Sequence, residues 1–142
     1  MAEGILRDKL KKNNIPASVD SCGFESFHIG DPPDSRAQVV AGKRGIDLSA
    51  HRVRLFTRND FDEFDHIYIM DSSHYRGLMN KARNDTDMKK VDYVMNVLYP
   101  AQNLDVRDPW YYDTGAFEKV FVQLDQACEV IAKNLKNGSN PR

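Results

Sequence analysis

Apolar residues recur every three or four positions at both ends of the chain, and this spacing predicts amphipathic helices. One predicted helix covers residues 2–14, and its apolar stripe consists of Ile5, Leu6 and Leu10. The other covers residues 116–137, and its stripe consists of Phe117, Val120, Phe121, Leu124, Cys128, Ile131 and Leu135. Cys128 is therefore expected to be a small core residue rather than a nucleophile. Gly138 follows as a stop signal, and residues 138–142 are expected to fray.

Between these two helices, short apolar runs alternate with stretches that begin with capping residues. The apolar runs predict strands at 17–22, 66–70 and 92–98. The other stretches predict a short helical turn at 60–65 and helices at 36–44 (capped by Asp34 or Ser35) and 74–84 (capped by Ser72 or Ser73). Strands that alternate with helices indicate an α/β fold, in which a mainly parallel sheet is covered by helices on both faces. Residues 1–142 are expected to form one domain.

Charge and composition exclude several classes of function. The net charge of the 142 residues is −1, so no basic footprint for nucleic acid or an anionic membrane is expected. No apolar run approaches the ~20 residues of a membrane span, and the first residues lack the apolar core of a signal peptide. Two cysteines and five methionines fit a reducing cytoplasm better than a disulfide scaffold. The scattered cysteines and histidines predict no metal site.

The stretch "DVRDPWYYDTGAF" (105–117) is unusual for a polar segment that precedes a long helix. Pro109 fixes its own φ and pushes Asp108 towards an extended conformation, so the carboxylate is presented rigidly beside three aromatic residues. A rigid carboxylate between aromatic walls could be a proton donor in a pocket. It could equally belong to an ordinary loop turn whose aromatic side chains pack downwards.

Nearly the whole chain resembles a low-molecular-weight protein tyrosine phosphatase. The stretches that carry the resemblance are "MAEGILRDKL", "DSCGFESFHIGDPPDSRA", "GIDLSAHRVRLF", "FDHIYIMDSSHYRGL" and "DPWYYDTGAFEKVF". The resemblance implies a three-layer α/β/α fold with a four-stranded parallel sheet. It also implies hydrolysis of phosphotyrosine or other aryl phosphomonoesters through a cysteinyl-phosphate, without a cofactor. The implied partner is a phosphotyrosine protein or a small aryl phosphate.

The resemblance gives roles to individual residues. Asp108 matches the general acid that protonates the leaving phenolate. Trp110 and Tyr111 match one aromatic wall of the substrate slot, and Phe27 and His28 fall on the opposite wall.

Three further residues match positions that support the phosphate-binding loop. Ser21 and His51 match a serine and a histidine that hydrogen-bond this loop, although Ser21 could merely end a strand and His51 could be a solvated loop residue. Asp71 is expected at the carboxyl ends of the strands, where α/β folds place ligands. It could equally be the N-cap of the following helix.

One departure from the family is serious. These phosphatases begin with a strand and a Cys-x5-Arg-Ser/Thr-Pro loop, and Met1 aligns just after that loop. Cys22 is followed six residues later by His28, and Cys128 by Asn134, so neither cysteine has an arginine partner. Residues 1–142 are therefore expected to be a truncated, inactive form in which the central strand is missing. A second copy could fill that position in a strand-exchanged oligomer, or the position is vacant.

Three functions remain open at this point. The first is a phosphatase that lacks its N-terminal loop. The second is a non-catalytic relative that serves as a binding module, although such a module has little need to keep the acid beside its aromatic wall. The third is an enzyme similar to arsenate reductases, which would need further redox cysteines late in the chain. Only Cys128 is available there.

Overall fold

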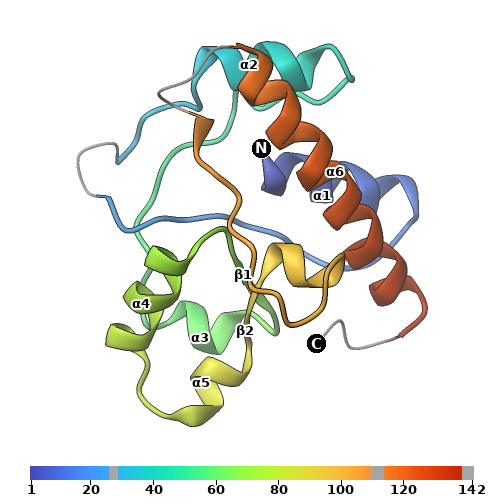
Figure 1. The fold of residues 1–142 in the computed structure, drawn as a ribbon. Coiled ribbons are helices and arrows are strands. Elements are labelled where there is room, and N and C mark those ends of the chain that lie inside the picture. Colours follow the sequence, from blue (N-terminus) through green and yellow to red (C-terminus); the bar gives the residue numbers. More distant parts are fainter. Residues whose placement is uncertain (26–28, 110–113, 139–142) are drawn as a thin grey trace.

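The computed structural model describes residues 1–25, 29–109 and 114–138 (Figure 1). These described residues form two strands, β1 (Ile67–Ile69) and β2 (Val91–Tyr93). The helices are α1 (Ala2–Lys12), α2 (Ser35–Gly42), α3 (Asp60–Glu63), α4 (Ser72–Lys81), α5 (Asp85–Lys89), the 3₁₀ helix η2 (Val94–Val97) and α6 (Thr114–Lys136).

The two strands form a parallel pair, with Ile67 opposite Val91 and Ile69 opposite Tyr93. The chain passes from β1 to β2 through α4 and α5, which makes a strand–helix–strand unit. Parallel neighbours require such a crossover, because their carboxyl ends lie at the same edge of the sheet. The predicted α/β class with a parallel sheet is confirmed.

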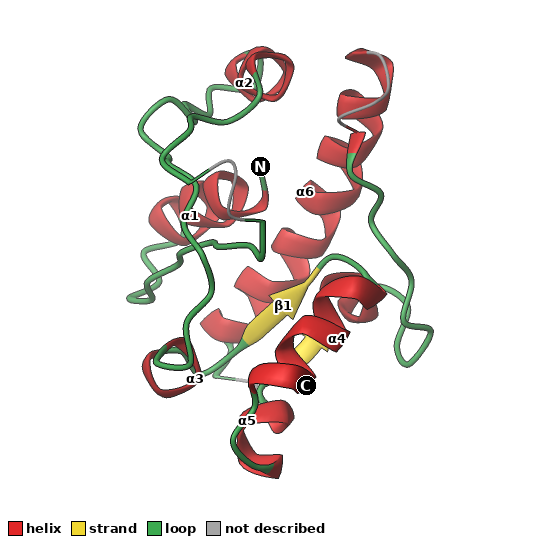
Figure 2. Cartoon of the chain, turned by 90° about the vertical axis from the view of Figure 1, so that its left-hand side faces the viewer, coloured by secondary structure: helices red, strands yellow, loops and turns green. Residues whose placement is uncertain are grey.

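Helices cover both faces of β1. Tyr68 and Met70 pack against a large apolar cluster that includes side chains of α1 and α6. Ile69 belongs to a second cluster with Phe61 of α3 and Leu78 of α4. Successive side chains of a strand point to opposite faces, so the strand separates the two clusters. Figure 2 shows the same arrangement, with α4 in front of β1 and α6 behind it. The predicted three-layer α/β/α order is confirmed.

The predicted terminal helices are confirmed, with slightly different limits. The first ends at Lys12 instead of residue 14, and the last begins at Thr114 instead of residue 116. The two helices pack against each other, and the buried Cys128 lies in their shared core as predicted.

Two strand predictions for the middle of the chain were wrong, and one helix was missed. Residues 17–22 form no strand, and the nearby pairing is a single bridge between Gly23 and Leu55. These residues are mostly exposed, and a strand forms only where a neighbour satisfies its backbone groups. The strand predicted at 92–98 ends at Tyr93, where the chain turns into η2. Helix α5 was missed, although Asn84 caps it by accepting a hydrogen bond from the Asp87 amide at 3.0 Å.

Gly4 allows α1 to lie close to the segment that follows α2. A Cβ atom at this position would collide with the Leu48 side chain and would lie 3.3 Å from Cγ2 of Ile46. Both neighbours are buried, so they have little room to move. We expect Gly4→Ala to lower the free energy of unfolding by about 1–2 kcal/mol through overpacking. Gly42→Ala is the matched control, because nothing lies within 4 Å of its added Cβ. Urea unfolding should show no loss of stability for the control, and equal losses for both variants would contradict this packing.

Candidate active site

Ser21 and His51 lie thirty residues apart in the chain but meet at the first turn of α1. The Ser21 hydroxyl donates to Oε1 of Glu3 at 2.7 Å, and Nδ1 of His51 lies 3.4 Å from the same oxygen. Oγ of Ser21 and Nε2 of His51 are 3.5 Å apart. The two residues that were expected to support a phosphate loop are therefore neighbours. Their role towards such a loop stays a prediction.

Glu3 is the centre of this cluster, although no pattern in the sequence pointed to it. Its side chain is only 9% exposed, and Arg7 forms an ion pair with it at 2.8 Å. The Arg7 guanidinium also donates to the carbonyl of Val19 at 2.8 Å, which ties the segment before Ser21 to α1. A Glu in the first turn of a helix with an Arg four residues later usually indicates a solvated surface pair. Only the fold brings Ser21 and His51 to this carboxylate.

Asp71 follows β1 directly and is the N-cap of α4. Its carboxylate accepts hydrogen bonds from the His74 amide at 3.1 Å and from the Ser73 hydroxyl. Burial raises the pKa of this carboxyl, but the bonds from Ser73 and His74 outweigh burial and hold it below its usual range. The contacts described for Asp71 lie within the first turn of α4. They favour the capping alternative that the sequence had left open.

Asp108 lies on a segment that is anchored beside the end of β1. The Val106 amide donates to the carbonyl of Met70 at 2.7 Å, and the Val106 side chain is 4% exposed. Pro109 is also buried, whereas Asp108 between them is exposed. The carboxylate is therefore held at the carboxyl end of the strand with its side chain at the surface. Figure 1 shows this segment running past the sheet towards α6.

The residues predicted to form the walls of the slot (Phe27, His28, Trp110 and Tyr111) lie outside the described residues, so the two-walled slot stays a prediction. The loop that carries Phe27 and His28 is described at both ends. Gly23 exchanges hydrogen bonds with Arg54 and Phe56 at 3.0 and 2.9 Å. Gly30 donates to Val53 at 2.8 Å. This loop therefore begins and ends on the segment that follows His51.

Neither cysteine has the character of an activated nucleophile. Burial raises the pKa of the Cys128 thiol to about 12, and its sulfur lies 3.7 Å from the carbonyl of Ala2. Cys22 is an exposed residue, but its thiol is partly desolvated. This desolvation raises the pKa of the thiol to about 11, although the positive charge of Arg54 favours the thiolate. Reactive cysteines need a lowered pKa, because the thiolate is the attacking species. Both thiols are protonated at neutral pH.

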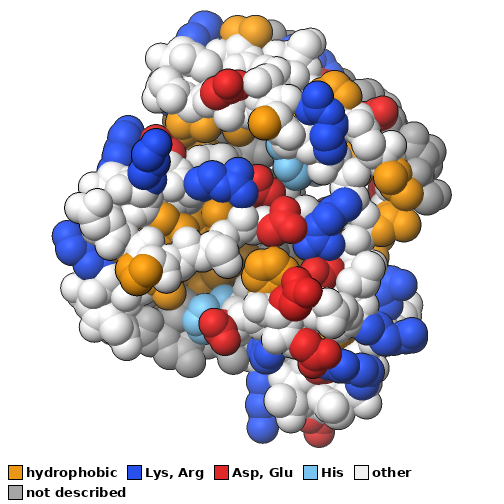
Figure 3. All heavy atoms as spheres, turned by 180° about the vertical axis from the view of Figure 1, so that it is seen from behind, with side chains coloured by type: hydrophobic (Ala, Val, Ile, Leu, Met, Phe, Trp, Pro, Cys, Tyr) orange, Lys and Arg blue, Asp and Glu red, His pale blue; other side chains and the backbone are white. Residues whose placement is uncertain are grey.

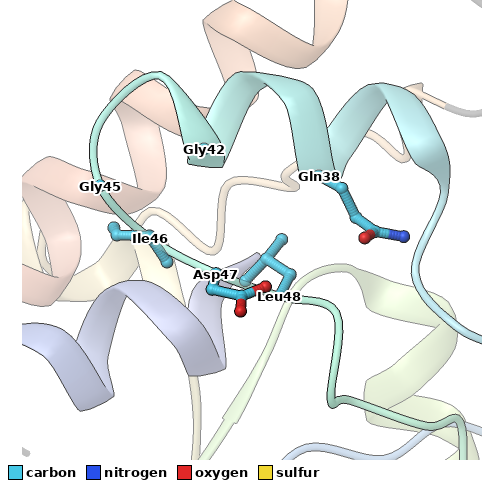
Figure 4. A pocket seen from close by; sticks show the side chains of 6 residues that line it. All are labelled: Gln38, Gly42, Gly45, Ile46, Asp47 and Leu48. Atoms are coloured by element: carbon cyan, nitrogen blue, oxygen red, sulfur yellow. The ribbon is translucent and has the colours of Figure 1, made fainter.

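The described residues offer few features of other kinds of site. No group of three or more metal-ligating side chains occurs in these parts of the chain. No described helix is long and apolar enough to cross a membrane. Positive and negative side chains are interspersed over the face in Figure 3. A hollow of about 240 Å³ lies under α2 (Figure 4), and it is lined by Gln38, Gly42, Gly45, Ile46, Asp47 and Leu48. None of these residues is a predicted site residue.

Comparisons of the sequence with known proteins point to one family. A family model for low molecular weight phosphotyrosine protein phosphatases matches residues 1–140. The human low molecular weight phosphotyrosine protein phosphatase is 33% identical over 130 residues, which cover 90% of this chain and 82% of that protein. The Bacillus subtilis low molecular weight protein-tyrosine-phosphatase YfkJ is 32% identical over 141 residues, which cover 96% of this chain and 86% of that protein.

Solved structures agree with the sequence comparison. The crystal structure of YfkJ from Bacillus subtilis has a TM-score of 0.86 at 28% identity, and the match covers 98% of this chain and 87% of that chain. A protein tyrosine phosphatase from Entamoeba histolytica, solved with Hepes in its active site, also has a TM-score of 0.86, at 27% identity. That match covers 96% of this chain and 88% of the other. The chain therefore belongs to the family of low molecular weight phosphotyrosine protein phosphatases.

Proposed function

We propose that this chain carries the general acid and the substrate slot of a protein tyrosine phosphatase that hydrolyses phosphotyrosine or another aryl phosphomonoester. The observation that supports this proposal best is the position of Asp108. Its carboxylate is exposed between two buried residues, Val106 and Pro109, beside the carboxyl end of β1. Ligands of α/β proteins bind at this edge of the sheet.

In this mechanism Asp108 donates its proton to the phenolate oxygen as the bond to phosphorus breaks. Trp110 and Tyr111 form one wall against the aryl ring, and Phe27 and His28 form the other. Ser21 and His51, joined by Glu3, support the loop that binds the phosphate. The reaction needs no cofactor, because phosphoryl transfer depends mainly on positioning and on stabilisation of charge.

The proposed reaction also needs a thiolate that attacks phosphorus and an arginine that binds its oxygens. Residues 1–142 contain no Cys-x5-Arg motif, and the thiols of Cys22 and Cys128 both have raised pKa values. We therefore propose that residues 1–142 are inactive unless a strand and a Cys-x5-Arg loop precede α1. A strand-exchanged oligomer and a cytoplasmic location stay predictions.

The buried Cys128 thiol also counts against the chemistry of an arsenate reductase. Thiol–disulfide exchange requires an accessible thiolate. Cys128 is 1% exposed and lies in the core between α1 and α6. A phosphatase therefore remains the function that the described residues support best.

The test compares two proteins. One is residues 1–142, and the other, called the extended chain here, has a family N-terminal strand and Cys-x5-Arg loop joined in front of Met1. Sequencing of the DNA upstream of the Met1 codon would supply the natural segment if it is encoded there. We expect the extended chain to release phosphate from p-nitrophenyl phosphate and residues 1–142 to remain at background. An extended chain that folds but shows no turnover would refute the proposed function.

A further inference from the structure

The segment that carries Asp108 is tied to the protein at a second point, three residues before the acid. The carboxylate of Asp105 accepts a hydrogen bond from the Ser72 amide at 3.1 Å and one from the Ser72 hydroxyl at 3.3 Å. Ser72 is the first residue of α4. The sequence assigned no role to Asp105, and the proposed mechanism does not use it.

A buried tyrosine orients the Ser72 hydroxyl. The hydroxyl of Tyr93, which is 8% exposed at the end of β2, donates to Oγ of Ser72 at 3.1 Å. The Tyr93 ring is held in place by the parallel ring of Tyr75, whose centre lies 6.0 Å away. Because the Ser72 oxygen accepts the hydrogen bond from the Tyr93 hydroxyl, its own O–H can donate to Asp105. A line of hydrogen bonds therefore runs from the core to Asp105.

Asp105 and Asp71 accept hydrogen bonds from different amides at the start of α4. Asp71 accepts a hydrogen bond from the His74 amide, so the helix already has an N-cap without Asp105. Asp105 accepts a hydrogen bond from the Ser72 amide, which is one of the first four amides of the helix and has no partner inside it. The positive end of the helix dipole also favours a carboxylate at this position. Helix capping alone therefore does not require the second carboxylate.

We propose that Asp105 is a positioning residue for Asp108, an inference that rests on the proposed function. Asp105 ties the segment to α4, the Val106 amide ties it to β1, and Pro109 is buried on the far side. Asp108 is therefore preceded by two hydrogen-bonded anchor points and followed by a buried proline. Precise placement matters for a proton donor, because a shift of about 1 Å can cost roughly 10²-fold in rate.

The experiment measures kcat/KM in the extended chain for aryl phosphates whose leaving phenols differ in pKa. We expect Asp105→Ala to lower kcat/KM about 10-fold for poor leaving groups and less than about 2-fold for good ones, because only poor ones need the proton. Asp105→Asn should recover most of the loss, since its amide oxygen can accept the same two hydrogen bonds. Asp34→Ala, which removes the N-cap of α2, is the matched control and should not change the dependence on the leaving group.

A double variant separates positioning from a general loss of structure. In the Asp108→Asn background, Asp105→Ala should cause no further loss that depends on the leaving group, because the two changes act through one group. A uniform loss across the phenols, or losses that multiply fully with those of Asp108→Asn, would overturn the inference. An extended parent without activity would instead overturn the proposed function, and with it any catalytic role of Asp105.

The hydrogen bond itself can be tested in residues 1–142 without any activity. We expect Asp105→Ala to speed hydrogen exchange at the Ser72 amide while exchange at the core amides of α6 stays unchanged. Unchanged exchange at Ser72 would show that Asp105 does not hold this amide in solution, which would also overturn the inference.

Discussion

Asp108→Asn in the extended chain is expected to slow the hydrolysis of aryl phosphates with poor leaving groups by about 10²–10⁴-fold. An amide cannot supply the proton that a departing phenolate of high pKa requires. A phenolate of low pKa leaves without protonation, so its rate should fall much less. The measurement is the rate of phosphate release, or of phenol release in a rapid burst, across a series of substituted phenyl phosphates. The slope of log rate against phenol pKa should become steeper in the variant.

A further observation would distinguish a lost proton donor from a damaged site. The Asp108→Asn variant should still bind an unreactive phosphonate as tightly as the parent. An equal loss for all leaving groups would mean that Asp108 is not the general acid.

Asp60→Asn is expected to lower the free energy of unfolding by about 2–3 kcal/mol, because it breaks a largely buried ion pair. Asp60 is 5% exposed, and both of its oxygens accept hydrogen bonds from the Arg54 guanidinium, at 3.0 and 3.1 Å. The Thr57 amide adds a third bond at 2.9 Å. The Arg54 side chain is 35% exposed, and Asp20 also pairs with it, so the loss should stay below that of a fully buried pair. Urea unfolding of the folded protein measures the difference.

The same change should alter the pH dependence of stability. Burial raises the pKa of Asp60, but the bonds from Arg54 and Thr57 outweigh burial and lower it. A carboxyl with a lowered folded pKa stabilises the protein above its unfolded pKa of about 3.9, and this contribution is lost as pH falls through the folded pKa. The difference in stability between the parent and Asp60→Asn should therefore be constant near neutral pH and shrink below about pH 4.

Asp62→Asn is the control, because it makes the same chemical change in the same short helix. The Asp62 side chain is 60% exposed and pairs with Arg83 at 2.7 Å. Exposed pairs contribute about 0–1 kcal/mol, so this variant should be nearly as stable as the parent. Similar losses in the free energy of unfolding at both positions would show that burial of the Asp60–Arg54 pair does not increase its contribution to stability.

Local patterns were sufficient to predict most of the helices and the character of several residues. The apolar stripe at 116–137 predicted α6 and the core position of Cys128, because a 3–4 spacing places side chains on one face whatever the helix packs against. Capping residues located α2, since an Asp or Ser side chain satisfies amides only a few positions away. The resemblance to the phosphatases depended on short motifs in the same way, and the family comparison confirmed it.

Strands and site clusters depended on partners that lie far away in the sequence. Residues 17–22 and 94–98 have the composition of strands, yet a strand exists only where a second backbone completes its hydrogen bonds. The meeting of Ser21 and His51 at Glu3 joins three segments that share no local pattern. The hydrogen bonds from Ser72 to Asp105 likewise cross thirty-three positions. Periodicity and capping are local consequences of backbone geometry, whereas these contacts arise only when the packed layers bring distant segments within about 3 Å of each other.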